Sequence, residues 1–191
     1  MKIKRFKEFK KVLIIHGFGV TSQSCFYPWL KSELESKGFN VELPELPEPS
    51  DPLVEEQVQY ILKNYPSQKH IIICHSFGGC VGMKLMESLD YEVESLYLVS
   101  CFGDNNFHEG DEDIEKLEHT TDWIFNYEDI KSKCQNIHVL KPSIETFVTD
   151  AQMGDLASNL GTYVESFESV ENHATGKEEP DLLNFIIQNE N

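Results

Sequence analysis

A serine follows a short apolar run near the middle of the chain, in a setting that could make its hydroxyl a nucleophile. The stretch IIICHSFGG places Ser76 after three isoleucines and two positions before Gly78. A nucleophile turn of the pattern G-x-S-x-G lies between a strand and a helix and lifts the serine hydroxyl above the sheet. Cys74 stands here in place of the first glycine. Because cysteine is small, we expect the crowded turn to accept it, and we predict that Ser76 is a nucleophile.

This candidate nucleophile needs a base and hydrogen-bond donors, because a serine hydroxyl alone is weakly nucleophilic. His173, in the stretch VENHA, lies in the loop after the last predicted strand, where the base of such a site is expected. The backbone N–H groups of Phe18 and Phe77 are predicted to form an oxyanion hole, since the loop after the first strand should begin close to the serine turn. His16, in the stretch HGFG, is expected to be a structural residue of the substrate pocket and not a second base.

A carboxylate that orients the imidazole of the base would complete the site. Glu145 lies in the loop after the fifth predicted strand, where the chain order serine, acid, histidine places the acid. Asp104, after the fourth strand, and Asp150, at a predicted helix start, are alternatives, and Asp150 also fits a helix N-cap. The absence of any acid partner is a further possibility. We predict Glu145, with its carboxylate about 3 Å from a ring nitrogen of His173.

The elements that must position these residues alternate along the chain. We predict strands over 11–17, 39–44, 69–75, 93–100, 136–140 and 162–169, and helices over 24–38, 53–65, 78–89, 123–134, 150–160 and 178–189. This alternation is typical of a parallel sheet with helices on both faces. We therefore predict one three-layer α/β/α domain over residues 1–191, with a mostly parallel sheet of about six strands in the order 2-1-3-4-5-6. The carboxyl ends of its strands would bring the candidate site residues together.

Aromatic residues near these strand ends could form the walls of a substrate pocket. Phe18 follows the first predicted strand, Phe102 follows the fourth, and Trp123, Phe125 and Tyr127 lie in the next predicted helix. Aromatic side chains also belong to hydrophobic cores, so each of the five could be a core residue instead.

Composition limits the partners and cofactors that the chain could use. The formal net charge is -17, with 33 acidic and 16 basic residues, so binding to nucleic acid is not expected. No apolar run approaches the ~20 residues that span a membrane, and no signal-peptide pattern follows the basic start. The five cysteines are scattered, with no C-x-x-C pair and no H-E-x-x-H motif. We expect a cytoplasmic protein that needs no metal and no organic cofactor.

Several stretches together resemble a known family. VLIIHGFG, IIICHSFGG, LYLVS and VENHA are similar to the small serine hydrolases of the retinoblastoma-binding protein 9 and YdeN family, a compact branch of the α/β-hydrolases, and the similarity extends over most of the chain. The resemblance implies the compact α/β-hydrolase fold, with Ser76 as nucleophile, His173 as base and Glu145 where the family has an aspartate. It also implies esterase-like hydrolysis of small esters, thioesters or amides through an acyl-enzyme. The sequence departs from the family at Cys74, at Glu145 with Ile144 before it, and at NHA in place of G-H-F.

A second function is compatible with these departures. The chain could be a catalytically weak or inactive protein that uses the hydrolase scaffold to bind a protein partner. The acidic segment 104–122 or the proline-rich stretch LPELPEP would then form the partner surface. Labelling with a fluorophosphonate separates the two functions, because the probe reacts only with an activated serine.

Overall fold

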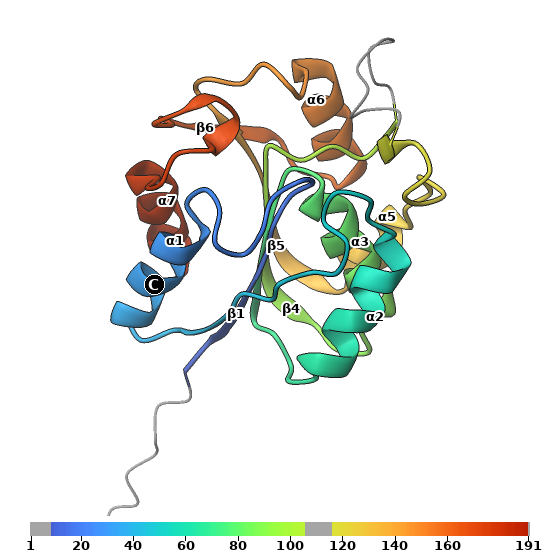
Figure 1. Ribbon diagram of the computed structural model, residues 1–191, viewed down its shortest axis with the longest axis horizontal. Helices are drawn as coiled ribbons and strands as arrows, with labels where there is room; N and C mark the ends of the chain where they lie inside the picture. The colour runs from blue at the N-terminus through green and yellow to red at the C-terminus, as the bar shows by residue number, and fades with distance from the viewer. Residues whose placement is uncertain (1–8, 106–115, 191) are drawn as a thin grey trace, which may run out of the picture.

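One parallel sheet organises the part of the chain that the structure describes, residues 9–105 and 116–190. The structure is a computed structural model, shown in Figure 1. All strand pairs are parallel, and the six strands lie in the order β2-β1-β3-β4-β5-β6. Their bounds are β1 Lys11–Ile15, β2 Asn40–Glu42, β3 Ile71–His75, β4 Val93–Val99, β5 Cys134–Pro142 and β6 Val164–Phe167. The predicted fold class and strand order are confirmed.

Helices cover both faces of this sheet (Figure 1). One face carries α1 (Tyr27–Ser36) and α7 (Pro180–Glu190). The other carries α2 (Val54–Asn64), α3 (Gly78–Ser88), α5 (Tyr127–Ser132) and α6 (Asp150–Asn159). None of the helices in the described ranges is long and apolar enough to cross a membrane.

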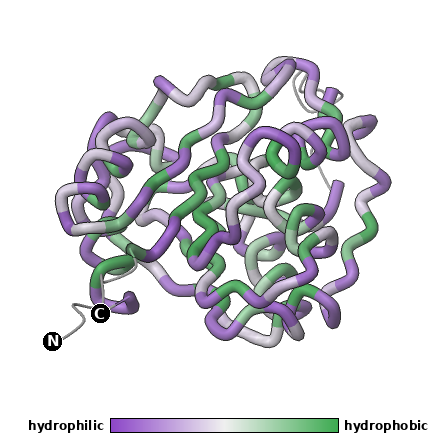
Figure 2. The backbone as a smooth tube through the Cα atoms, turned by 90° about the horizontal axis from the view of Figure 1, so that it is seen from below, coloured by the Kyte–Doolittle hydropathy of each residue, from purple (hydrophilic) through white to green (hydrophobic). Residues whose placement is uncertain are grey.

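The central strands are apolar on both faces, as expected for strands buried between two helical layers. Along β1, Leu13 and Ile15 pack under α2 and α3, whereas Val12 and Ile14 pack under α1 and α7. This alternation follows from the period of two along a strand. Figure 2 shows the hydrophobic stretches gathered at the centre of the molecule, with hydrophilic segments around them.

The predicted helix over 123–134 is shorter than expected. Its α-helical part, α5, begins at Tyr127, where the Asn126 side chain accepts a 3.1 Å hydrogen bond from the Asp129 N–H. Trp123 has a φ of 56°, in the left-handed region, so the chain is not helical there. Helix α6 begins at Asp150, but Thr149 is its N-cap and forms a capping box with Gln152.

The acidic segment 104–122, predicted as a partner surface, falls partly outside the described residues. Residues 106–115 carry much of this segment, and residues 1–8 carry most of the basic start of the chain. These two stretches therefore have no structural description.

Helix α3 packs very closely on the sheet, and two of its glycines make this possible. A Cβ on Gly78 would lie 2.6 Å from the backbone oxygen of His16 and 2.7 Å from that of Ile15. A Cβ on Gly82 would overlap the sulfur of Cys74. The cysteine at the first position of the serine turn therefore occupies space that the helix leaves empty at Gly82.

This contact predicts a paired effect on stability. Gly82→Ala should lower the free energy of unfolding by about 1–3 kcal/mol, because the new methyl group overpacks against Cys74. The same change in a Cys74→Ala background should cost much less, since the Cys74 Cβ lies 3.6 Å from a Cβ at position 82. Urea unfolding of the single and double variants measures the coupling.

Gly154 is the matched control for this pair. It also lies inside a helix, α6, but a Cβ there meets nothing within 4 Å. Gly154→Ala should raise stability by roughly 0.5–1 kcal/mol, as alanine is the better helix former. Equal effects at Gly82 and Gly154 would contradict the proposed clash.

Candidate active site

Ser76 lies at the turn between β3 and α3 in a strained backbone conformation. Its φ is 55°, a left-handed value that residues with a side chain rarely adopt. The turn is held by hydrogen bonds from the Ser76 N–H to Val99 O (2.9 Å) and from the Gly79 N–H to Ser76 O (2.9 Å). Strain of this kind persists only where surrounding contacts fix it, and it is common at functional sites. The turn has the form predicted for a nucleophile, with Cys74 buried beneath it.

His173 connects Ser76 to Glu145. Its Nε2 lies 2.8 Å from Ser76 Oγ, and its Nδ1 lies 2.8 Å from Glu145 Oε2 and 3.0 Å from Oε1. A carboxylate only accepts hydrogen bonds, so the Nδ1–H donates to Glu145. Nε2 is then free to accept the proton of the serine hydroxyl. The distance of about 3 Å that was predicted between Glu145 and His173 is thus present.

Glu145 stays ionised although its side chain is fully buried. Burial alone would raise its pKa, but hydrogen bonds from His173 and from two backbone N–H groups outweigh this, and the pKa of Glu145 is lowered. The backbone donors are Phe147 (2.8 Å) and Val148 (3.0 Å), both to Oε1. The loop therefore folds around its own carboxylate, which places the longer side chain of a glutamate in reach of the imidazole.

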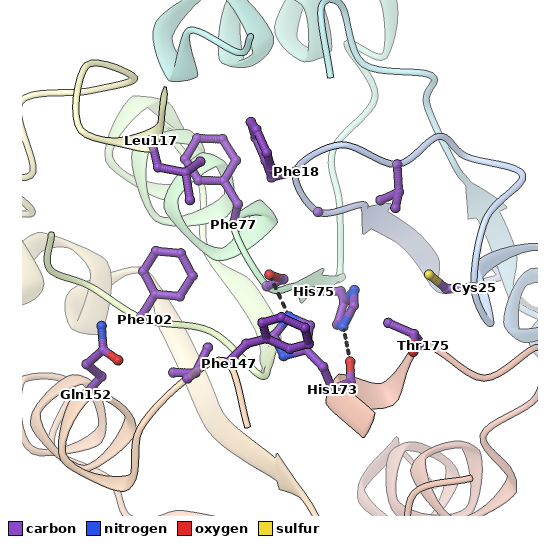
Figure 3. Close-up of a pocket in the computed structure, with 14 residues that line it drawn as sticks. Phe18, Cys25, His75, Phe77, Phe102, Leu117, Phe147, Gln152, His173 and Thr175 are labelled. Atoms are coloured by element: carbon purple, nitrogen blue, oxygen red, sulfur yellow. Dashed lines mark hydrogen bonds between the residues drawn. The ribbon is translucent and has the colours of Figure 1, made fainter. Parts of the chain in front are cut away.

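The backbone of His173 is as constrained as that of Ser76. Its φ is 57° and its ψ 26°, in a short 3-10 turn that spans Asn172–Ala174. The His173 N–H donates to Ile144 O over 2.8 Å, and the His173 carbonyl oxygen lies 2.8 Å from His75 Nε2, the dashed line between these two residues in Figure 3. Both backbone polar groups of this strained residue are therefore held, one by the acid loop and one by the serine turn.

His75 is fully enclosed between these elements. Besides His173, it contacts Tyr27, whose hydroxyl lies 2.6 Å from His75 Nδ1. Burial, with the nearby His173, lowers the pKa of His75 to about 3, so the ring is neutral at physiological pH. Both ring nitrogens are occupied, so His75 cannot serve as a second base.

The two alternative acids lie away from the imidazole. Asp104 accepts a 3.3 Å hydrogen bond from the side chain of Gln152. Asp150 is exposed and pairs with Lys141. Neither carboxylate is bonded to His173, so geometry favours Glu145.

A pocket of about 280 Å³ opens beside Ser76. Its walls are mostly apolar and come from five loops or helix starts; Figure 3 shows them around the histidine. They include Phe18, Phe77, Phe102, Leu117, Phe147 and Val148. Within the described ranges, the backbone N–H groups of Phe18 and Phe77 have no backbone acceptor, and both residues line the pocket.

Of the five aromatic residues predicted as pocket walls, Phe18 and Phe102 line this pocket. Trp123 stacks on Phe102, with ring centroids 6.1 Å apart. Phe125 is buried in the core beneath the Lys84 ammonium, and the Tyr127 hydroxyl donates to the Gly103 carbonyl. These three residues do not line the pocket as predicted, because each packs against another part of the described chain.

His16 is also absent from the pocket walls, which corrects its predicted place there. Its side chain is buried behind the first loop, where Nε2 accepts a 3.1 Å hydrogen bond from the Leu46 N–H. Nδ1 then carries the proton and donates to Gly17 O over 3.0 Å. This arrangement agrees with the prediction that His16 is a structural residue and not a second base.

The sequence interpretation missed part of the pocket. Phe147, Val148 and Gln152 line it from the segment that follows Glu145, and Leu117 lines it from beyond β4. Phe147 packs edge-on against the His173 ring at 5.2 Å between centroids. Its position two residues after the predicted acid could have identified it, because the loop that carries the acid must approach the histidine.

Comparisons with known proteins agree with the fold. Residues 12–158 match the model of the alpha/beta hydrolase family. The chain belongs to this family. Within the described ranges of this α/β hydrolase, no group of three or more histidine, cysteine or acidic side chains could hold a metal ion.

Several α/β hydrolases are similar over most of the chain. YdeN of Bacillus subtilis (strain 168), whose name describes it as a hydrolase, is 24% identical over 156 residues, which cover 79% of each protein. The crystal structure of YdeN has a TM-score of 0.82 at 20% identity, covering 94% of this chain and 98% of YdeN. The resemblance to the YdeN family is thereby confirmed, whereas kinship with retinoblastoma-binding protein 9 stays a prediction.

Two further solved structures share the fold at lower identity. An extracellular α/β-hydrolase from a Paenibacillus species has a TM-score of 0.71 at 16% identity, covering 94% of this chain and 98% of its own. Polyneuridine aldehyde esterase has a TM-score of 0.68 at 14% identity, covering 96% of this chain and all of its own length, 100%.

The neutral state of His75 predicts how stability depends on pH. Its pKa is about 3 in the native protein and 6.5 without the fold, so only the unfolded chain takes up a proton between these values. The stabilisation of the native state by the neutral His75 ring is complete above pH 6.5 and is lost as the pH falls. Lowering the pH from 7.5 to 5 should therefore reduce the free energy of unfolding by ~2 kcal/mol through this histidine alone.

Urea unfolding at the two pH values measures this loss, with His75→Gln as the comparison. Carboxylates change their protonation little in this range. Over this pH change the variant should lose about 2 kcal/mol less of its free energy of unfolding than the wild type, because glutamine does not titrate. A wild type and variant with the same pH dependence would show that His75 can be protonated in the native state.

Proposed function

We propose that the chain is a serine hydrolase that cleaves small esters, with thioesters and amides as related substrates, through an acyl-enzyme on Ser76. The observation that carries the proposal is the unbroken hydrogen-bonded series from Ser76 Oγ through His173 to Glu145, at the edge of an apolar pocket. In this series each side chain has the partner that nucleophilic catalysis requires.

The first half of the reaction forms the acyl-enzyme. Ser76 Oγ attacks the carbonyl carbon while His173 Nε2 takes the hydroxyl proton. The ionised Glu145 stabilises the imidazolium that forms. The N–H groups of Phe18 and Phe77 hold the negative oxygen of the tetrahedral intermediate. His173 then gives its proton to the leaving alcohol, thiol or amine as the bond to the carbonyl carbon breaks.

The second half repeats these steps with water as the nucleophile. His173 takes a proton from the water, the water oxygen attacks the acyl carbonyl, and Ser76 leaves with the proton returned by His173. The products are the free acid and the original enzyme. No other reactant is needed.

The pocket supports a small, uncharged and apolar acyl group. Its volume of about 280 Å³ lies just below the ~300–1,000 Å³ typical of small-molecule sites. Among the described residues that form its walls, none is a lysine, arginine or carboxylate that could pair with a charged substrate. Burying an unpaired charge there would be costly, which favours neutral esters such as short alkanoates.

Cys25 is the rival nucleophile, since it also lines the pocket. Burial raises the pKa of its thiol, so little thiolate is present at neutral pH. Its side-chain hydrogen-bond partner among the described residues is the Tyr27 hydroxyl, whereas Ser76 is paired with the imidazole of His173. The proposal therefore assigns the covalent step to the serine.

Replacing the nucleophile tests the proposal. Ser76→Ala should abolish hydrolysis of p-nitrophenyl butyrate and labelling by a fluorophosphonate, because both need the activated hydroxyl. Circular dichroism and the unfolding midpoint of the variant should stay near those of the wild type. Cys25→Ser is the matched control and should keep most of the activity.

A wild-type protein that neither hydrolyses esters nor reacts with the probe would overturn the proposal. In that case the scaffold would serve as a protein-binding module. Turnover that persists in Ser76→Ala and disappears in Cys25→Ser would instead move the nucleophile to the cysteine.

A second prediction concerns the acid. Glu145→Gln should lower kcat by several orders of magnitude, because an amide cannot stabilise the imidazolium and favours the wrong tautomer. Asp104→Asn removes one negative charge from the loop after β4, at the same end of the sheet as Glu145, and should change kcat less than about threefold. Steady-state kinetics with p-nitrophenyl butyrate measures both. A large loss in Asp104→Asn with normal turnover in Glu145→Gln would reverse the assignment.

A further inference from the structure

A chain of hydrogen bonds passes beneath the proposed active site and joins four parts of the protein chain. It runs from the Gly17 N–H to the Tyr27 hydroxyl (3.3 Å), from Tyr27 to His75 Nδ1 (2.6 Å), and from His75 Nε2 to the carbonyl oxygen of His173 (2.8 Å). The loop after β1, the first residue of α1, the end of β3 and the histidine loop are thus connected. Tyr27 and His75 are both buried.

The chemistry of these groups fixes the direction of every bond. A carbonyl oxygen can only accept, so the Nε2 of His75 must carry a hydrogen and donate to His173. Because the buried ring is neutral, its Nδ1 has a lone pair and accepts from the Tyr27 O–H. The tyrosine oxygen can then accept from the Gly17 N–H. Each donor has one acceptor, and the other neutral tautomer of His75 would break the bond to His173.

Both ends of the chain lie at groups that the proposed reaction uses. Gly17 precedes Phe18, whose N–H is a proposed oxyanion donor, and it lies against the serine turn: a Cβ on Gly17 would come within 3.1 Å of the Ser76 Cβ. At the other end, the bond from His75 restrains the carbonyl of His173, whose backbone is in the left-handed region. Such strain persists only where neighbours hold it.

We propose that Tyr27 and His75 are positioning residues, which hold the oxyanion loop and the backbone of His173 in register with Ser76. This inference rests on the serine hydrolase function proposed above. The two side chains act through Gly17 and His173, since all their polar atoms are bonded within the chain and none is left for the substrate.

The tyrosine hydroxyl can be removed without disturbing the packing. Tyr27→Phe keeps the ring, which packs on Phe26 with centroids 4.9 Å apart, and removes the hydroxyl that links Gly17 to His75 and also contacts Cys25. Tyr97→Phe is the matched control. Tyr97 is equally buried, and its hydroxyl donates over 2.8 Å to Glu190 at the end of α7 instead of to the site. Both changes should cost similar stability.

Only Tyr27→Phe should affect the reaction. We expect its kcat for p-nitrophenyl butyrate to fall about tenfold or more, with KM within about twofold, because the misplaced groups act in the transition state. The rate constant for fluorophosphonate labelling should fall in parallel. Tyr97→Phe should match the wild type in both. Equal kcat values in the two phenylalanine variants would overturn the inference.

Two variants of the histidine test the other link. The amide nitrogen of a glutamine reaches near the position of imidazole Nε2, so His75→Gln can still donate to the His173 carbonyl. His75→Leu cannot. We expect kcat to be at least about fivefold higher in His75→Gln than in His75→Leu, with both folded by circular dichroism. Equal kcat values in the two would also count against the positioning role.

These measurements separate this inference from the proposed function. If the wild type shows no turnover that depends on Ser76, the hydrolase function fails, and the positioning role fails with it. If the wild type is active and Ser76→Ala is not, but Tyr27→Phe and Tyr97→Phe behave alike, only the positioning role is wrong.

Discussion

The contact between Ser76 Oγ and His173 Nε2 is the constraint on which the rest of the structure depends. It joins residues 97 positions apart in the sequence, and both have left-handed backbones. Conformations of this kind cost of order 1–3 kcal/mol each. The serine is held by the meeting of β3, β4 and α3, and the histidine by hydrogen bonds to Ile144 and His75. The sheet and two loops together maintain one contact of 2.8 Å.

The serine turn shows how a larger residue can occupy a position that usually requires glycine. Cys74 points away from the pocket toward α3, where Gly82 leaves room for its sulfur. The helix therefore approaches the sheet as closely as the turn requires. The cysteine is fully buried and burial raises its pKa, so it acts as a small apolar side chain rather than as a thiol.

Sequence patterns predicted the sheet and the hydrogen-bonded series better than they predicted the pocket. The order of strands follows from the alternation of apolar runs, and the positions of Ser76, Glu145 and His173 follow from chain order along parallel strands. The pocket walls depend instead on loop conformation. No pattern indicates that the chain is left-handed at Trp123, or that the N–H groups after Glu145 turn back to its carboxylate and bring Phe147 to the histidine.

Two of the three departures from the family pattern, Cys74 and Glu145, are each compensated by a neighbouring feature. Gly82 accommodates the cysteine, and the Phe147 and Val148 N–H groups draw the longer carboxylate of Glu145 back to the distance at which it reaches His173. The same loop also supplies Ile144 O to the His173 N–H, so the acid and the base are fixed by one set of bonds. Both adjustments leave His173 within hydrogen-bonding distance of Ser76 and of Glu145, as the proposed hydrolysis requires. This argument favours the enzyme over a binding module on the same scaffold.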